Sequence, residues 1–161
     1  YLRGRNLYIG LYLNELLERI LRDGHPAAPV FDRYHHIARH LVRNIEDVEP
    51  LLRSFEYALL EEMGYGFPLD RDSVSGELCR AGAYYSFHPQ HGLQLGGHSA
   101  ESNRFPGEHL LAMAAIDYSE PGVRLTAKKL MRAALAPHLG AKPLQSRELF
   151  RGYFPTTEVR E

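Results

Sequence analysis

The sequence predicts a mainly α-helical fold: a helical bundle-like domain with an irregular insert that carries a small β-hairpin. Apolar residues recur with a period of about 3.6 residues before residue 64 and again after residue 107. Between these stretches the period disappears, and Gly, Pro, Ser, Asp and Asn accumulate. The 161 residues, 44% hydrophobic and 24% charged, are enough to bury a core. We expect helices at 1–64, the insert at 65–107, and further helices at 108–161 that complete the helical domain.

Three helices are predicted before the insert. Apolar side chains repeat at helical spacing over 7–21, 30–44 and 47–63. Gly24 ends the first of these patterns and Gly64 ends the third. Because the connections are short, we expect the three helices to pack as antiparallel neighbours.

The insert is too long and too polar to hold its shape without help. Two short runs with strand character, 83–87 and 93–95, flank 88–92 and predict a small hairpin. An insert of this length with little apolar content needs a clamp, a binding partner or tolerance of mobility. The sequence leaves these three alternatives open.

The last segment combines helical patterning with concentrated positive charge. Helices are expected at 108–117, 123–139 and 146–154, and the stretch 121–154 holds seven Lys/Arg and one acid, Glu148. Such a density of cations attracts phosphate, with an affinity that falls as salt screens it. A basic face that serves only solubility is the alternative. The candidate phosphate-contacting residues are Arg124, Lys128, Lys129, Arg132, Lys142, Arg147 and Arg151.

Nine histidines and one cysteine raise the question of a metal or catalytic site. His36 and His40 share a helix face, but without a third ligand in sequence reach a solvated pair is the better interpretation. The insert lacks the paired, closely spaced cysteines of a structural zinc site. No motif orients a base beside Cys79, so we expect no enzyme and no cofactor, zinc included. The metal-capable insert residues are Asp70, Asp72, Cys79, His88, His91 and His98.

The setting of the protein is indicated by what the sequence lacks. A single cysteine excludes an internal disulfide and fits a reducing cytoplasm. No run of about eighteen apolar residues occurs, so no transmembrane helix is expected. Because the sequence begins with Tyr1 and shows no leader, we interpret it as a fragment of a longer protein.

Arg53 stands at the border of the apolar face of the third predicted helix. One interpretation is a surface arginine whose aliphatic stem covers core residues. The other is a guanidinium at the rim of an apolar groove, suited to the carboxylate of a peptide. Both remain open at this point.

Three motifs together resemble the bacterial RecO family of recombination and repair mediators. They are Leu-Tyr-Leu-Asn-Glu-Leu-Leu at 11–17, Leu-Arg-Ser-Phe-Glu at 52–56 followed by Gly-Tyr-Gly at 64–66, and Leu-Gly-Ala-Lys-Pro-Leu-Gln-Ser-Arg-Glu-Leu-Phe at 139–150. The last is the most specific, and the three cover nearly the whole chain. The resemblance implies that an N-terminal OB-fold domain is missing from this sequence.

The resemblance also implies function, partners and site residues. Family members bind single- and double-stranded DNA, anneal complementary strands, and act in the bacterial cytoplasm at the nucleoid without catalytic turnover. They partner RecR and dock the acidic C-terminal tail of single-stranded DNA-binding protein, so that RecA can be loaded. Carried over, Arg53 with Leu13 and Leu52 is expected to bind that tail. A protein-docking module with little DNA binding of its own is the alternative, and a zinc-dependent enzyme is a more remote one.

Many relatives carry a four-cysteine zinc site, and here this chain departs from the family. The positions that correspond to the first Cys-x-x-Cys are Asp72 and Ser75, and the second cysteine pair is missing as well. The departure weakens the expectation of zinc and leaves open what holds residues 70–106 in place.

Overall fold

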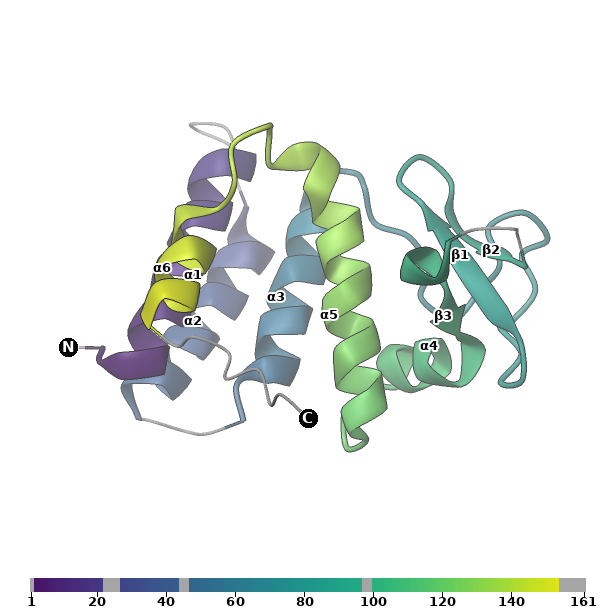
Figure 1. The fold of residues 1–161 in the computed structure, drawn as a ribbon, viewed down its shortest axis with the longest axis horizontal. Helices are drawn as coiled ribbons and strands as arrows, with labels where there is room; N and C mark the ends of the chain where they lie inside the picture. Colours follow the sequence, from purple (N-terminus) through teal and green to yellow (C-terminus); the bar gives the residue numbers. More distant parts are fainter. Residues whose placement is uncertain (1, 22–26, 44–46, 97–99, 154–161) are drawn as a thin grey trace, which may run out of the picture. The chain divides into compact units, whose positions relative to one another are not determined.

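Helices dominate the computed structural model, which describes residues 2–21, 27–43, 47–96 and 100–153 (Figure 1). The described part contains six α-helices and one three-stranded antiparallel sheet. The predicted fold class is therefore confirmed. None of the described helices is long and apolar enough to cross a membrane.

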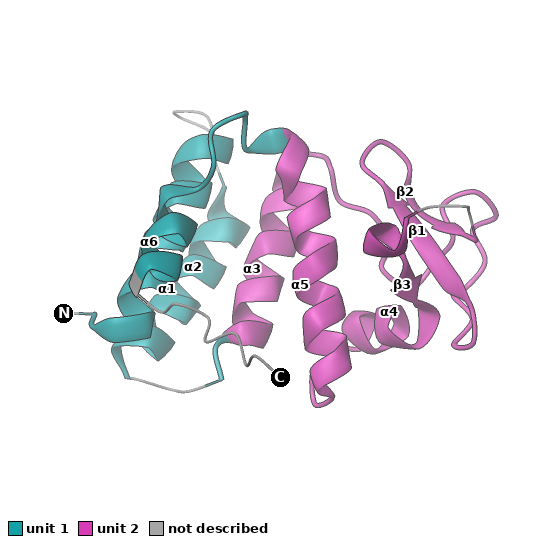
Figure 2. Ribbon diagram, in the orientation of Figure 1, with its two compact units in different colours: residues 1–48, 138–161 teal, residues 49–137 magenta. Residues whose placement is uncertain are grey.

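The chain divides into two compact units (Figure 2). Residues 1–48 and 138–161 form unit 1, and residues 49–137 form unit 2. This division follows packing, whereas the expected segments 1–64, 65–107 and 108–161 follow changes in sequence pattern. One consequence is that the basic stretch 121–154 supplies side chains to both units.

Unit 1 consists of α1 (Gly4–Ile20), α2 (Ala28–Val42) and α6 (Gln145–Tyr153). The apolar period of α1 buries Tyr12, Leu13, Leu16 and Ile20, as the spacing predicts. Helix α2 has a proline in its first turn, where the missing N–H costs no hydrogen bond, and its Val30, Ile37 and Leu41 are buried. The side-chain amide of Asn6 donates to the Leu41 carbonyl at 3.0 Å, which fastens the start of α1 to the end of α2.

The helices of unit 2 are α3 (Glu49–Glu62), α4 (Gly107–Ala114) and α5 (Pro121–Leu135). Buried side chains of α3 and α5 share one core, in which Phe55, Leu59, Ala127 and Leu130 are inaccessible to solvent or nearly so. Helix α3 ends at Glu62, and the predicted stop, Gly64, follows two residues later. Its φ of 78° places it in the left-handed region, where glycine carries no steric penalty.

The insert contains the predicted hairpin and one strand that the sequence did not reveal. Strands β1 (Tyr84–His88) and β2 (Gly92–Leu95) pair antiparallel, with Phe87 opposite Leu93. Strand β3 (Phe105–Pro106) joins the other edge of β1, in the order β2-β1-β3. A two-residue strand has no periodicity to detect. It lies beside β1 together with the Asn103 side chain, which bonds both the N–H and the C=O of Phe87, at 3.2 and 3.0 Å.

Candidate nucleic-acid interface

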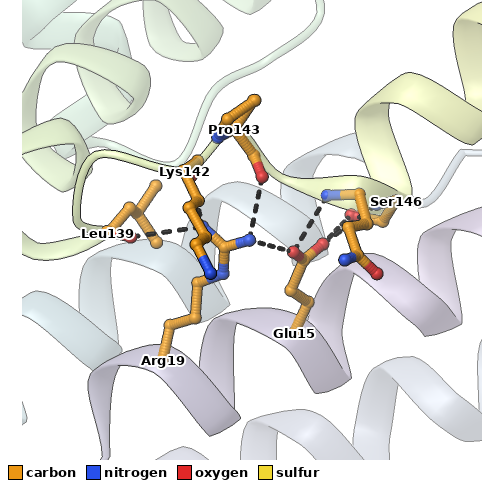
Figure 3. Close-up of polar contacts among 7 residues, drawn as sticks. Glu15, Arg19, Leu139, Lys142, Pro143 and Ser146 are labelled. Carbon is orange, nitrogen blue, oxygen red and sulfur yellow. Dashed lines mark hydrogen bonds and ion pairs between the residues drawn. The ribbon is translucent and has the colours of Figure 1, made fainter.

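The most specific motif of the sequence, Leu139–Phe150, is held on α1 by two side chains (Figure 3). Arg19 donates from Nη1 to the carbonyls of Leu139 and Lys142, at 3.2 and 2.5 Å, and from Nη2 to that of Pro143 at 2.8 Å. The guanidinium also pairs with Glu15, with 2.6 Å between Nη2 and Oε1. We call this arrangement the Glu15–Arg19 clamp.

Glu15 is the N-terminal cap of α6, although it lies on a different helix. Its Oε1 accepts the N–H of Gln145 at 2.9 Å, and its Oε2 accepts the N–H and hydroxyl of Ser146, at 3.0 and 2.7 Å. The first amides of a helix have no partner within it, and a carboxylate also complements the positive end of the helix dipole. A cap from 130 residues away replaces the local cap that this helix would otherwise need.

The charge state of Glu15 is coupled to this contact. Burial raises the pKa of the carboxyl, but the hydrogen bonds from the Ser146 hydroxyl and from the amides of Ser146 and Gln145 outweigh it. The pKa is therefore held below its ordinary value of 4.5. Glu15 remains ionised at neutral pH and stabilises the attachment of α6.

The candidate cations of unit 1 differ in what their side chains do. Lys142 and Arg151 are exposed. Arg147 lies 5.3 Å from the centre of the Tyr12 ring and donates to the Tyr12 hydroxyl at 3.3 Å. The ring contact between Tyr8 and Phe150, 5.9 Å between centroids, packs the same two helices together. Arg147 thus supports the packing of α6, and the other two extend from it.

The candidate cations of unit 2 lie along α5. Arg124 donates from Nε to the Tyr118 carbonyl at 2.6 Å. Lys129 donates to the carbonyls of Glu101 and Arg104, at 2.9 and 3.0 Å, and stands 4.9 Å from the centre of the Phe105 ring. These two cations fasten loops to the helix. Lys128 is half-buried and Arg132 is exposed.

Arg53 is buried in this structure. Its side chain is 7% exposed, and Nη1 lies 2.8 Å from Oε2 of Glu56, one helical turn along α3. This contact is an ion pair without hydrogen-bond alignment, and Arg53 Nε has no acceptor among the described residues. Leu52 on α3 and Leu13 on α1 are buried too. A buried arginine and a surface arginine occupy the same helical period, so the sequence could not distinguish them.

Asp72 and Ser75, where the family resemblance places cysteines, form a hydrogen-bonded turn. Oδ1 of the buried Asp72 accepts the amides of Val74 and Ser75, at 2.7 and 2.8 Å, and Oδ2 accepts the amide of Leu95 at 2.5 Å. The Ser75 amide contributes most to holding the pKa of Asp72 below its ordinary 3.8, against the opposing effect of burial. One carboxylate therefore closes the turn and ties it to β2.

Two of the metal-capable residues of the insert, Asp72 and Cys79, lie in surroundings that disfavour zinc binding. Both oxygens of Asp72 already accept N–H groups, and burial raises the pKa of the Cys79 thiol, partly offset by a hydrogen bond with Tyr85. Zinc binds the thiolate, which this environment disfavours. Across residues 2–21, 27–43, 47–96 and 100–153, no three His, Cys, Asp or Glu lie close enough to hold a metal ion. His98 is outside these ranges.

A comparison with models of known protein families identifies the family of this chain. The family model described as "Recombination protein O C terminal" matches residues 2–148. The chain belongs to this family. The resemblance carried by the three motifs is therefore confirmed.

Curated proteins of the RecO family match nearly the whole of this chain. The chain is 46% identical over 149 residues to the DNA repair protein RecO of Pseudomonas aeruginosa (strain LESB58). This match covers 92% of this chain and 63% of that protein. It is 47% identical over 151 residues to the RecO of Pseudomonas putida (strain W619), covering 94% and 65%. It is 47% identical over 154 residues to the RecO of Stutzerimonas stutzeri (strain A1501), and this match covers 93% of this chain and 62% of that protein. The chain thus spans less than two thirds of the length of these relatives.

In this RecO-family chain the first and last of the three motifs are bound to each other. Glu15 belongs to the 11–17 motif, and Ser146 belongs to the 139–150 motif. Reasoning from sequence missed Glu15 and Arg19 as positioning residues. The available signal was an acid and a base four residues apart on one helix, which is too common to single out.

Replacing Glu15 by Gln is predicted to loosen α6. The glutamine amide has one acceptor oxygen where the carboxylate has two, so it can accept only some of the hydrogen bonds from Gln145 and Ser146, and it carries no charge. We therefore expect the free energy of unfolding at pH 7 to fall by about 1–3 kcal/mol. Because the folded pKa is lowered, the charge stabilises the fold above about pH 4.5 and ceases to do so as pH falls through the folded pKa. Urea denaturation across this pH range measures both effects. Glu18→Gln, an exposed acid on the same helix, is the control, and equal losses for the two variants would contradict the clamp.

Replacing Asp72 by Asn is predicted to destabilise the insert. The NH2 group of asparagine then faces backbone amides that need an acceptor. Each buried group that loses its hydrogen bond lowers the free energy of unfolding by about 1–3 kcal/mol. The stabilisation is present above pH 3.8 and is lost as pH falls through the lowered pKa. Thermal unfolding and amide exchange at Ser75 and Leu95 measure the change.

Two controls accompany the Asp72 variant. Asp70→Asn alters a more exposed carboxylate in the same insert, so its effect is expected to stay within about 0.5 kcal/mol. A chelator is expected to leave the unfolding temperature of the wild-type chain unchanged. A chelator-induced drop, with stoichiometric zinc in the purified protein, would show that a metal orders the insert.

Proposed function

We propose that this chain is the C-terminal part of a non-enzymatic, DNA-binding mediator of recombinational repair. The observation that carries the proposal is membership of the RecO family over residues 2–148, with relatives named DNA repair protein RecO. The whole protein would bind single- and double-stranded DNA, promote annealing, and dock RecR and the tail of single-stranded DNA-binding protein so that RecA is loaded. It would act in the bacterial cytoplasm at the nucleoid.

The placement of the candidate cations supports a division of roles. Arg132, Lys142 and Arg151 are exposed, and with Lys128 they are proposed to contact phosphates. Arg124 and Lys129 in unit 2, and Arg147 in unit 1, are proposed to position the surrounding segments of their own unit through contacts with carbonyls and rings. Phosphate contacts fix the position of a protein on DNA without reading its sequence. The proposed activity is therefore binding with little sequence preference.

The salt dependence of DNA binding tests this proposal. With four cations on duplex phosphates, the slope of log affinity against log salt is expected to be about −4. The charge reversal Lys128→Glu with Arg132→Glu is expected to lower affinity at least tenfold at low salt and to flatten the slope by about 2. Fluorescence anisotropy with a labelled duplex measures both.

The matched control for this experiment is a charge reversal elsewhere in unit 2. Arg71 and Arg80 lie in the insert with half or more of each side chain exposed, and Arg71→Glu with Arg80→Glu makes the same change of charge. This pair is expected to leave the slope nearly unchanged. If both pairs weaken binding equally, the effect is one of total charge and α5 is not the contact surface.

A second candidate function, docking of an acidic C-terminal peptide, is favoured by Arg53. Its Nε is buried without an acceptor in the described part of the chain, and Leu52 lies beside it in sequence. A carboxylate could satisfy this group if the surroundings of α3 open. The alternative that the chain is chiefly a docking module rests on this one residue.

A test at Arg53 must avoid unfolding the protein. Arg53→Ala alone removes the ion-pair partner of the buried Glu56, which is expected to cost about 3–5 kcal/mol. The double change Arg53→Met with Glu56→Gln removes both charges at similar volume and is expected to stay folded. Isothermal titration with an acidic peptide ending in Phe is then expected to show at least a tenfold loss for the double variant. Arg71→Gln removes an exposed arginine of the same unit and serves as control, and wild-type affinity in the double variant would rule out the peptide-binding role of Arg53.

A further inference from the structure

The outward face of α2 carries a line of exposed side chains that the sequence pattern did not assign to any function. Its buried side is formed by Val30, Ile37 and Leu41. The opposite side has Phe31, His35, Arg39 and Arg43 at successive intervals of four residues, and all four are exposed. We call these four residues the α2 ridge. They run along the whole length of the helix.

The ridge is cationic, and among the described residues its two arginine side chains have no polar partner. Asp32 is the one acid between residues 28 and 43, against Arg33, Arg39 and Arg43. The Arg39 and Arg43 side chains make no hydrogen bond or ion pair in the described part of the chain. This contrasts with α5, where Arg124 and Lys129 are bound to main-chain carbonyls. Two unneutralised guanidinium groups one turn apart favour an anionic ligand.

The histidines beside the ridge add to its polar character. His40 Nδ1 lies 2.9 Å from the His36 carbonyl, and the two rings are 4.4 Å apart. The described residues supply no third ligand near this pair. The exposed His36 and the half-buried His40 extend the same outward face.

Phe31 gives the ridge a second kind of binding group. A phenylalanine on a helix is normally turned into the core, yet Phe31 is 47% exposed at the first turn of α2. Proteins that bind single strands combine cations that follow the backbone with aromatic rings on which unpaired bases stack. Duplex bases are already stacked and cannot use such a ring.

We propose that the α2 ridge is a contact surface for single-stranded DNA. Arg39 and Arg43 bind successive phosphates, and Phe31 stacks on an unpaired base at the other end of the helix. The inference rests on the proposed function for its ligand class, nucleic acid, and adds a site on unit 1 outside the basic stretch 121–154. It also assigns a strand preference, because the ring distinguishes unpaired from paired bases.

The test is binding of a labelled oligothymidine and of a duplex of equal length by the full 161-residue chain. Arg39→Gln with Arg43→Gln is expected to flatten the salt slope for the single strand by about 1.4, because each phosphate that is no longer neutralised accounts for about 0.7. Phe31→Ala is expected to weaken single-strand binding about tenfold with the slope unchanged, and to leave duplex binding unaltered. All substitutions are of exposed side chains, and thermal unfolding confirms that the variants are folded.

The control and the contrary outcomes separate this inference from the proposed function. Arg71→Gln with Arg80→Gln makes the same charge change on unit 2 and is expected to preserve the slope. If the ridge variants bind oligothymidine like wild type while the Lys128/Arg132 variant weakens on duplex, the ridge is overturned and the proposed function stands. If the wild-type chain binds neither DNA in a salt-dependent way, both fall. Reduced affinity for an acidic peptide, with DNA binding intact, would reassign the ridge to a protein partner.

Discussion

The carboxylate of Glu15 at the start of α6 is the contact on which the C-terminal motif depends. Without it the amides of Gln145 and Ser146 have no acceptor, and the hydroxyl of the buried Ser146 loses its partner as well. Arg19 completes the arrangement by binding three carbonyls of the turn that leads into the helix. Two side chains on one face of α1 thus replace the local turn and cap signals that α6 lacks. Within the Lys-Pro-Leu-Gln-Ser-Arg-Glu-Leu sequence the main chain and the serine are held by Glu15 and Arg19, while Lys142 is left exposed.

The insert is also held by a side chain that binds backbone amides from separate segments of the chain. Asp72 accepts three amides from two segments of chain, and the Asn103 side chain binds the edge of β1 as a neighbouring strand would. A zinc ion bound by cysteine pairs can also hold neighbouring turns together, but it requires pairs of thiolates, and this chain has a single cysteine. A carboxylate surrounded by N–H donors can order a comparable turn because each charge-assisted hydrogen bond is stronger than a neutral one. This arrangement answers the question of how a polar insert with a small core is held in place.

The sequence predicted those features that depend on periodicity and failed where long-range polar contacts decide. Helical spacing located the helices, and Gly64 ended α3 as expected because a left-handed residue follows the helix. Strand β3 escaped prediction because two residues have no period and its edge is shared with a side chain from Asn103. The burial of Arg53 was equally hidden, since its partner Glu56 lies at ordinary helical spacing and only the packing around α3 shows that both are buried. Glu15 and Ser146 are more than a hundred residues apart, a distance at which a single sequence contains no pairing signal.

Charge counted along the sequence is therefore a poor guide to charge available at a surface. The stretch 121–154 is the most basic part of the chain, yet Arg124 and Lys129 bind carbonyls and Arg147 packs on a tyrosine ring. Helix α2 has fewer net charges, but Arg39 and Arg43 stand on its outward side with no partner in the described chain. A cation bound to a carbonyl retains its charge but gives up donors and mobility, and both matter for neutralising a phosphate. The polar contacts of each side chain, more than the local net charge, determine where this RecO-family domain can meet a polyanion.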